Sequence, residues 1–241
     1  MRRTNEPCEV ILALDVESRE KAEALLEGAG PNLRWVKIGL QTYLRDGPDF
    51  VQEVAAGGRQ VFLDLKLHDI PNTMAKAVES LGGLPVSMLT IHACAGPEAV
   101  ERCAEAVNEA LPGALLLAVT VLTSMDADTL RLVGVNENPE AQVRNLARLA
   151  TEAGAGGIVC SPLEIRPLRE TLPPRVKLVT PGIRPSGASL GDQKRVTTPA
   201  EAASSGANYL VIGRPILAAE NPAAALAGIQ AELNQPPAST S

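Results

Sequence analysis

The stretch VFLDLKLHDIPNT, residues 61–73, joins a strand-like apolar run to a dense group of charges. Side chains alternate between the two faces of a strand, so Phe62, Asp64 and Lys66 share one face while leucines and a valine occupy the other. Ionised groups are costly to bury unless they are paired. The chain must therefore supply partners for these charges where the strand ends.

Seven further apolar runs have the same strand-like character, and helical patterns lie between them. The eight predicted strands are 9–15, 34–39, 60–66, 86–92, 114–122, 156–161, 176–182 and 208–213. The predicted helices are 18–29 with Ser18 as its N-cap, 96–110, 138–154, 200–207 and 221–234. Alternation with short links indicates right-handed βαβ units and a parallel sheet, and eight units favour a closed (β/α)8 TIM barrel. The first strand ends in LDVES, which lacks the glycine-rich turn of a dinucleotide-binding sheet.

Length and composition support a single enzyme-sized domain. The barrel is predicted over 8–234, between a flexible N-terminal segment (1–7) and a disordered tail (235–241). The net charge is −6 and aromatic residues make up 2%, so the chain lacks the basic, aromatic surface of a nucleic-acid binder. It also lacks the polybasic clusters that bind anionic membranes, and neither a signal peptide nor a transmembrane helix is expected.

The cysteines and histidines show no metal-site spacing. The cysteines are Cys8, Cys94, Cys103 and Cys160. Without a CxxC pair, they are expected to be reduced, mostly buried thiols of a cytoplasmic protein. His68 is expected in a structural or loop role, and His92 as a core histidine or as support for the site. Neither lies at ligand spacing from a second histidine and a carboxylate, so no metal is predicted.

Charged residues recur at the ends of three neighbouring predicted strands. The C-terminal strand ends form the active-site face of a barrel, and Asp15, Lys37, Asp64 and Lys66 occupy such positions. Period-two alternation turns all four toward the barrel interior, together with Ala13, Trp35 and Phe62 on the same strands. We expect a network of two acids and two bases, in which mutual pairing makes partial burial tolerable. The alternative is a set of ordinary solvated charges.

Two loops in the second half of the chain indicate an anion-binding site. The segment 180–199 is rich in Gly, Pro, Ser and basic residues, and 213–217 reads GRPIL. Loops after the seventh and eighth strands form the usual phosphate site of barrels, and Arg214 could add a bidentate contact. A surface turn is the alternative for Gly213 and Arg214. The loop 182–195 is long enough to act as a lid.

Taken together, these motifs resemble the orotidine 5′-phosphate decarboxylase family. DLKLHDIPNT fits the DxKxxD-I-x-N-T signature, and LALD, VKIG, VTVLTS, TPGIRP, LGDQKR and VIGRPI extend the resemblance over nearly the whole chain. DxKxxD alone is shared with related sugar-phosphate barrels. Its combination with TPGIRP and the DQ-R loop makes the resemblance specific.

The resemblance implies a cofactor-free lyase that converts orotidine 5′-phosphate to UMP, as a homodimer with shared active sites. Lys66 would protonate C6 of the pyrimidine and Asp64 would lie beside the substrate carboxylate. Lys37 would complete the network, and Asp69 would be a catalytic group that reaches into the partner's site. The implied substrate-binding residues are Asp15, Lys37, Asp69, Ile70, Thr73, Thr123, Ser124, Pro181, Arg184, Gln193, Gly213 and Arg214.

Two other functions remain open from the residues alone. A magnesium-dependent sugar-phosphate decarboxylase or aldolase of the same barrel group would share DxKxxD, and metal dependence and pyrimidine binding would discriminate it. A non-catalytic barrel that binds a phosphate ligand would show tight binding without turnover.

Overall fold

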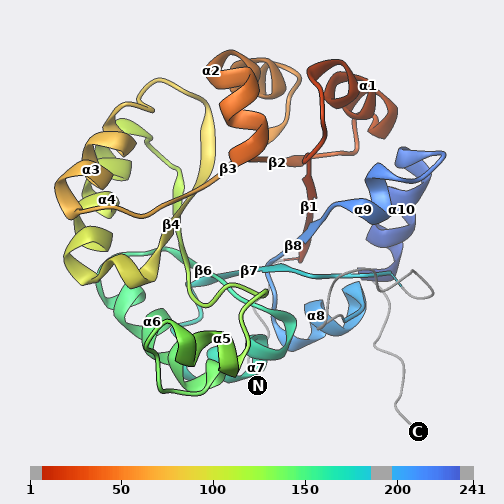
Figure 1. Cartoon of the computed structure of the whole chain (residues 1–241). Helices are drawn as coiled ribbons and strands as arrows, with labels where there is room; N and C mark the ends of the chain where they lie inside the picture. The colour runs from red at the N-terminus through yellow and green to blue at the C-terminus, as the bar shows by residue number, and fades with distance from the viewer. Residues whose placement is uncertain (1–6, 186–196, 234–241) are drawn as a thin grey trace, which may run out of the picture.

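Eight parallel strands close into a barrel that is surrounded by helices (Figure 1). The computed structural model describes residues 7–185 and 197–233. The strands are β1 (Glu9–Ala13), β2 (Trp35–Gly39), β3 (Gln60–Leu67), β4 (Val86–His92), β5 (Leu115–Val119), β6 (Gly157–Val159), β7 (Lys177–Pro181) and β8 (Tyr209–Ile212). They pair in chain order and β8 closes against β1. The predicted (β/α)8 barrel is confirmed, and each predicted strand overlaps an observed one.

Helices follow the strands and form the outer layer. They are α1 (Arg19–Ala29), α2 (Leu40–Ala56), α3 (Pro71–Glu79), α4 (Pro97–Ala110), α5 (Ala127–Leu132), α6 (Pro139–Glu152), α7 (Ile165–Thr171), α8 (Pro199–Ser205), α9 (Arg214–Leu217) and α10 (Pro222–Leu233), with 3-10 turns η1 (Ala93–Ala95) and η2 (Pro162–Glu164). Ser18 caps α1 as predicted, because its hydroxyl accepts a hydrogen bond from the Lys21 N–H at 3.3 Å.

Several helices were not among those predicted from the sequence, and α2 shows why. Its backbone leaves the helical region at Gly47, with a φ of 69°, and Pro48 follows at once. Proline lacks the N–H that a helix interior needs, so the apolar pattern is divided into two short pieces. The helices α3 and α7 are also short, with nine and seven residues, and offer few turns in which periodicity can be recognised.

Two apolar clusters divide the core into an interior and an outer shell. The interior of the barrel is filled by Ile11, Ala13, Trp35, Phe62, Met88, Leu117, Val179 and Val211. Alternate strand residues such as Leu12, Val36 and Leu63 belong to the larger cluster, which also contains the buried helix residues. The inward direction predicted for Ala13, Trp35 and Phe62 is therefore confirmed. A filled interior leaves the strand ends as the place for a site.

The predicted terminal segments, 1–7 and 235–241, fall outside the described residues apart from Pro7, so they remain predictions. Within 7–185 and 197–233, every helix is too short or too polar to cross a bilayer.

Candidate active site

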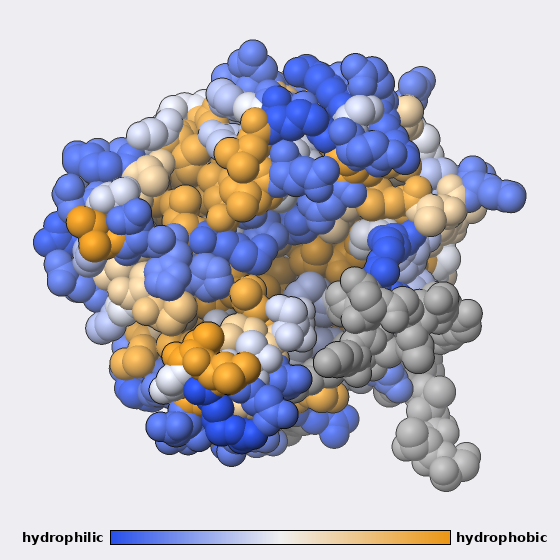
Figure 2. Space-filling model, viewed as in Figure 1, coloured by the Kyte–Doolittle hydropathy of each residue, from blue (hydrophilic) through white to orange (hydrophobic). Residues whose placement is uncertain are grey.

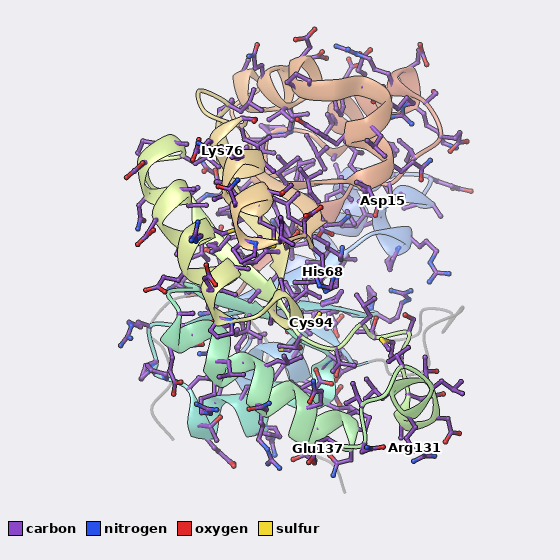
Figure 3. The ribbon with its side chains drawn as sticks, turned by 60° about the vertical axis from the view of Figure 1, so that its left-hand side comes forward. Asp15, His68, Lys76, Cys94, Arg131 and Glu137 are labelled. Carbon is purple, nitrogen blue, oxygen red and sulfur yellow. The ribbon has the colours of Figure 1, made fainter. Side chains whose placement is uncertain are left out.

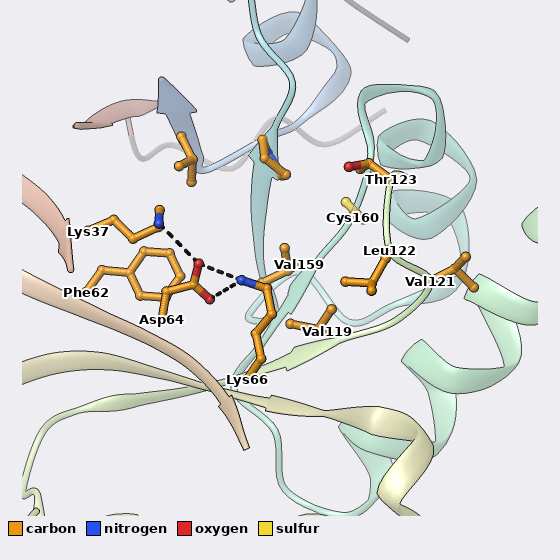
Figure 4. A pocket seen from close by; sticks show the side chains of 12 residues that line it. Lys37, Phe62, Asp64, Lys66, Val119, Val121, Leu122, Thr123, Val159 and Cys160 are labelled. Carbon is orange, nitrogen blue, oxygen red and sulfur yellow. Dashed lines mark hydrogen bonds and ion pairs between the residues drawn. The ribbon is translucent and has the colours of Figure 1, made fainter. Parts of the chain in front are cut away.

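Four charged side chains meet at the C-terminal ends of β1, β2 and β3. Lys37 Nζ lies 3.0 Å from Asp15 Oδ2 and 3.4 Å from Asp64 Oδ2, and Lys66 Nζ lies 2.7 Å from Asp64 Oδ2. The charges alternate in sign along the series, so each ammonium has at least one carboxylate partner. Figure 4 shows Asp64 between the two lysines. The structure thus brings together the four residues that the sequence predicts at the strand ends.

Burial is uneven across this network. The side chains of Lys37 and Asp64 are each 9% exposed, whereas those of Lys66 and Asp15 are 37% and 45% exposed. Asp15 follows the end of β1 by two residues, so it lies in the loop and not on the strand as predicted. The buried centre of the network is therefore the Lys37–Asp64 pair, and Lys66 is the ammonium that solvent or a ligand can reach.

The strand carrying Asp64 and Lys66 is irregular where they lie. Leu63 pairs with Leu89 and Leu67 pairs with Ile91, so the three residues from Asp64 to Lys66 stand opposite one residue of β4. Lys66 has a φ of 52° and is the one non-glycine residue with a positive φ in the described chain. That conformation costs about 1–2 kcal/mol for a residue with a Cβ. The bulge therefore holds Lys66 in a strained backbone conformation.

The charge of Asp64 is stabilised by its lysine neighbours. Burial disfavours the carboxylate, but the ammonium groups of Lys37 and Lys66 and hydrogen bonds from Lys66 and Thr90 more than offset that, so the pKa of Asp64 lies below its usual range. Asp64 is therefore ionised at neutral pH and accepts contacts on both oxygens.

Replacing Asp64 by Asn should reduce the free energy of unfolding by about 3 kcal/mol at neutral pH, because Lys37 and Lys66 would face each other without their carboxylate. Asp64 has its pKa lowered from 3.8, so its stabilisation is complete above that value and is lost as pH falls through the lower native pKa. Urea denaturation at a series of pH values should show a gap between parent and variant that closes in acid.

A suitable control for this variant is Glu79→Gln, which removes an exposed carboxylate paired with Lys76 at 2.7 Å. Exposed pairs contribute about 0–1 kcal/mol, so its stability should remain close to that of the parent. An Asp64→Asn variant as stable as the parent at neutral pH would contradict the assigned electrostatics.

A pocket of about 190 Å³ lies over the network and combines a charged side with an apolar side. Lys37, Asp64 and Lys66 line the charged side, and Phe62 lies beside them (Figure 4). The opposite wall is formed by Val119, Val121, Leu122, Thr123, Val159, Cys160, Pro181 and Val211. Burial raises the pKa of the Cys160 thiol to about 12, so this wall carries no charge at neutral pH. An apolar wall facing ammonium groups suits a flat ring with an anionic substituent.

The remaining predicted residues fall at different distances from this pocket. Thr123 and Pro181 line it, whereas Ser124, Gly213 and Arg214 are not part of its lining. Arg184 is buried, and its guanidinium donates to the carbonyl of Ile183 at 2.8 Å. Gln193 and most of the predicted lid, 182–195, lie outside the described residues.

Residues after β3 point to the exterior of the subunit. Asp69, Ile70 and Thr73 are all exposed, and the Asp69 carboxylate accepts a hydrogen bond from the Ile70 N–H at 2.7 Å. No ion pair joins Asp69 to Lys66 within the described part of the chain. Asp69 is therefore separate from the charged network of this chain.

The two histidines lie next to each other above β3 and β4. Their ring centroids are 5.4 Å apart. His68, labelled in Figure 3, is exposed, whereas His92 is half-buried. Burial, and then the positive charges of His68 and Lys66, lower the pKa of His92, which favours the neutral ring. The described residues contain no group of three or more His, Cys, Asp or Glu side chains that could hold a metal ion.

Sequence reasoning did not find two residues that shape the network. Thr90 is fully buried and its hydroxyl lies 2.9 Å from Asp64 Oδ1. Gly39 leaves space for the ion pair, because a Cβ there would lie 2.5 Å from Asp15 Oδ1 and 2.9 Å from Lys37 Nζ. The sequence does carry a signal for Thr90, because it is a polar residue at an inward position of the apolar run VSMLTIH. Gly39 has no signal in the sequence, because the close approach depends on how the chain after β1 lies against the end of β2.

A filled parallel barrel with an ion-pair network and an apolar wall at its carboxyl end has the architecture of a barrel enzyme. Residues 9–229 match the model of the "Orotidine 5'-phosphate decarboxylase / HUMPS family". The chain belongs to this family.

Individual relatives agree with the family match. A protein from Opitutus terrae named "Orotidine 5'-phosphate decarboxylase" is 58% identical over 94% of this chain and 98% of its own length. A protein of the same name from Moorella thermoacetica is 46% identical over 97% of this chain and 95% of its own length. The crystal structure of orotidine 5′-phosphate decarboxylase from Lactobacillus acidophilus has a TM-score of 0.85 and 34% identity, and the match covers 95% of this chain and all of that chain.

Proposed function

We infer that this protein decarboxylates orotidine 5′-phosphate to UMP, the last step of UMP synthesis. The observation that carries the inference is the Asp15–Lys37–Asp64–Lys66 network at the mouth of a barrel. Relatives of this chain, among them one that is 58% identical, are named for this activity. A cluster of fixed charges beside an apolar wall suits a reaction in which negative charge develops on a flat ring.

Lys66 is proposed as the group that stabilises this negative charge. When the bond between C6 and the carboxylate breaks, carbon dioxide leaves and the electron pair stays on C6, where the ring offers no adjacent electron sink. An ammonium placed at C6 stabilises the developing carbanion and then transfers its proton to C6. Lys66 suits this role because its Nζ is held by both Asp64 oxygens, at 2.8 and 2.7 Å, and remains partly exposed to the pocket.

Asp64 is proposed to destabilise the bound substrate before reaction, and the Asp15–Lys37 ion pair is proposed to bind the substrate. The substrate carboxylate would lie near the ionised Asp64, and the repulsion between the two carboxylates would be relieved as carbon dioxide leaves. Asp15 and Lys37 would hold the ribose hydroxyls. Thr123 and Ser124 would contact the pyrimidine against the apolar wall.

The phosphate is proposed to bind where the chain leaves β7 and β8. Pro181, Arg184 and Gln193 come from the first of these segments, and Gly213 and Arg214 from the second. Arginine can contact phosphate with two parallel hydrogen bonds. The phosphate is remote from the bond that breaks, so its binding free energy can drive closure of the 182–195 loop and be expressed in the transition state.

We also propose that two copies pair through the mouths of their barrels, so that Asp69, Ile70 and Thr73 contribute to the partner's site. Exposed apolar side chains follow the ends of β2 and β3, namely Leu40 at 53%, Leu44 at 75% and Ile70 at 66%. Figure 2 shows apolar surface over α2, next to the hollow at the barrel's centre. A patch of this kind is typical of an interface.

The enzyme is proposed to work in the cytoplasm, where an exposed thiol such as Cys94 stays reduced.

The function is tested by incubating purified protein with orotidine 5′-phosphate in EDTA and following the loss of orotate absorbance. Turnover should proceed without added metal or cofactor. Turnover abolished by EDTA would favour the magnesium-dependent alternative. Tight UMP binding without turnover would favour a binding protein.

Gly39→Ala should weaken UMP binding about ten-fold, equivalent to about 1.4 kcal/mol. The added Cβ would displace Asp15 Oδ1 and Lys37 Nζ, which are the ends of flexible side chains, so the free energy of unfolding should fall by less than in Asp64→Asn. Gly228→Ala is the matched control, since a Cβ on this α10 residue would meet nothing within 4 Å. Calorimetric titration with UMP measures the difference, and equal affinities for the two variants would contradict the role of Gly39.

A further inference from the structure

The bulge in β3 is matched by a single residue of β4. Asp64, Leu65 and Lys66 stand opposite Thr90, because the pairs on either side are Leu63 with Leu89 and Leu67 with Ile91. Regular pairing would satisfy the backbone of each residue with a neighbour on the adjacent strand. The bulge interrupts that ladder where the proposed catalytic lysine lies.

The side chain of Thr90 provides a hydrogen-bond partner for one backbone group of the bulge. The Lys66 backbone N–H donates to Thr90 Oγ1 at 2.9 Å, and the same hydroxyl donates to Asp64 Oδ1 at 2.9 Å. Thr90 is fully buried, with no exposed surface. One hydroxyl thus accepts from the backbone of the lysine and donates to the carboxylate that holds the lysine's ammonium.

These two bonds constrain the orientation of Lys66 at both ends. The first holds the backbone in its left-handed conformation, with a φ of 52°. The second fixes the Asp64 carboxylate, whose oxygens lie 2.8 and 2.7 Å from Lys66 Nζ. A buried hydroxyl with both a donor and an acceptor partner holds one rotamer, since any rotation would leave a buried group without its bond.

We propose that Thr90 is a positioning residue, whose hydroxyl sets the direction of the Lys66 ammonium through the bulge backbone and through Asp64. It does not touch the substrate. The proposal rests on the proposed catalytic role of Lys66 and extends it to a residue of the neighbouring strand. Because Thr90 acts on the group at C6 and not on the ribose or phosphate contacts, its loss should lower kcat and leave KM for orotidine 5′-phosphate close to the parent value.

The test compares three substitutions at Thr90. Thr90→Val keeps the shape and removes the hydroxyl, Thr90→Ala removes the hydroxyl with less steric demand, and Thr90→Ser keeps the hydroxyl. Misplacing a catalytic group by about 1 Å can cost roughly 100-fold in rate, so a kcat loss of that size is expected for Val and Ala, with most activity retained in Ser. Steady-state kinetics and thermal unfolding are measured for each variant.

Thr42→Val is the matched control. Thr42 is also fully buried and its hydroxyl donates to the Leu14 carbonyl at 2.9 Å, but it contacts neither Asp64 nor Lys66. It should lose stability to a similar degree while kcat stays near the parent value. A parent-like kcat in Thr90→Val, an equal loss in Thr90→Ser, or a loss confined to KM would overturn the proposal.

The crystal structure of Thr90→Val separates this proposal from the proposed function. The expected result is that Lys66 leaves its positive φ and its Nζ moves away from Asp64. If the parent protein did not turn over orotidine 5′-phosphate, the proposed function would fail, and the position of Lys66 in the variant would still decide the role of Thr90. An unchanged Lys66 conformation would overturn the positioning role whatever the activity of the parent.

Discussion

Lys66→Ala is expected to lose decarboxylation by at least roughly 10⁴-fold, because in the proposed mechanism a single ammonium supplies both the electrostatic stabilisation of the C6 carbanion and the proton that follows. Affinity for UMP should persist, since the proposed ribose and phosphate contacts come from other residues. Asp64 would lose its partner at 2.7 Å but keep Lys37 at 3.4 Å, so the network should not collapse. Loss of orotate absorbance gives the rate, and calorimetric titration with UMP gives the affinity.

Lys76→Ala is the matched control for this variant. Lys76 lies on α3, ten residues after Lys66, and pairs with the exposed Glu79. Figure 3 shows Lys76 apart from His68. Its removal should leave both rate and affinity near the parent values. Substantial decarboxylation by Lys66→Ala would show that another group protonates C6.

Asp69→Ala is expected to lower activity roughly 10²- to 10³-fold, if its carboxylate completes the charged network of the partner subunit. The defect should be repaired by mixing with Lys66→Ala. A heterodimer of the two variants contains one site with both Lys66 and Asp69 intact. Random exchange should therefore restore about one quarter of the parent sites in a two-fold symmetric dimer.

Three measurements make the mixing experiment decisive. Each variant is assayed alone, subunit exchange is followed by energy transfer between labelled copies, and the mixture is assayed after exchange is complete. Asp128→Ala, which removes an exposed carboxylate of α5, should be active alone and serves as the control for loss of a surface acid. Complete exchange without recovered activity would mean that each subunit builds its own site.

The fold could be predicted because its signals are local. Eight apolar runs of strand length, separated by helical patterns, leave few topologies other than the barrel. The inward side of each strand follows from alternation, which correctly placed Trp35 and Phe62 in the interior. Helix α2 was not predicted because Gly47 and Pro48 interrupt its pattern, although Phe50 and Val51, which follow the break, are buried in the core.

The four charged residues of the site could be predicted from the sequence. Buried ions need partners, so two acids and two lysines at neighbouring strand ends are enough to imply a network. The bulge at Asp64–Lys66 could not be predicted in this way, because it depends on how β3 and β4 are registered against each other. The contact of Thr90 with Asp64 follows from that register, whereas the space left by Gly39 depends on how the chain after β1 approaches the end of β2.

The interior of the barrel also carries the chain's single tryptophan, and this has a practical consequence for spectroscopy. Trp35 lies two residues before Lys37, in edge-to-face contact with Tyr209 at 5.2 Å between ring centroids. Its indole N–H has no hydrogen-bond partner among the described residues, and the side chain is buried. Indole fluorescence therefore comes from one water-poor position beneath the network. Its emission should shift to the red only when the strands themselves separate. Intrinsic fluorescence therefore reports opening of the barrel and is insensitive to fraying of the outer helices.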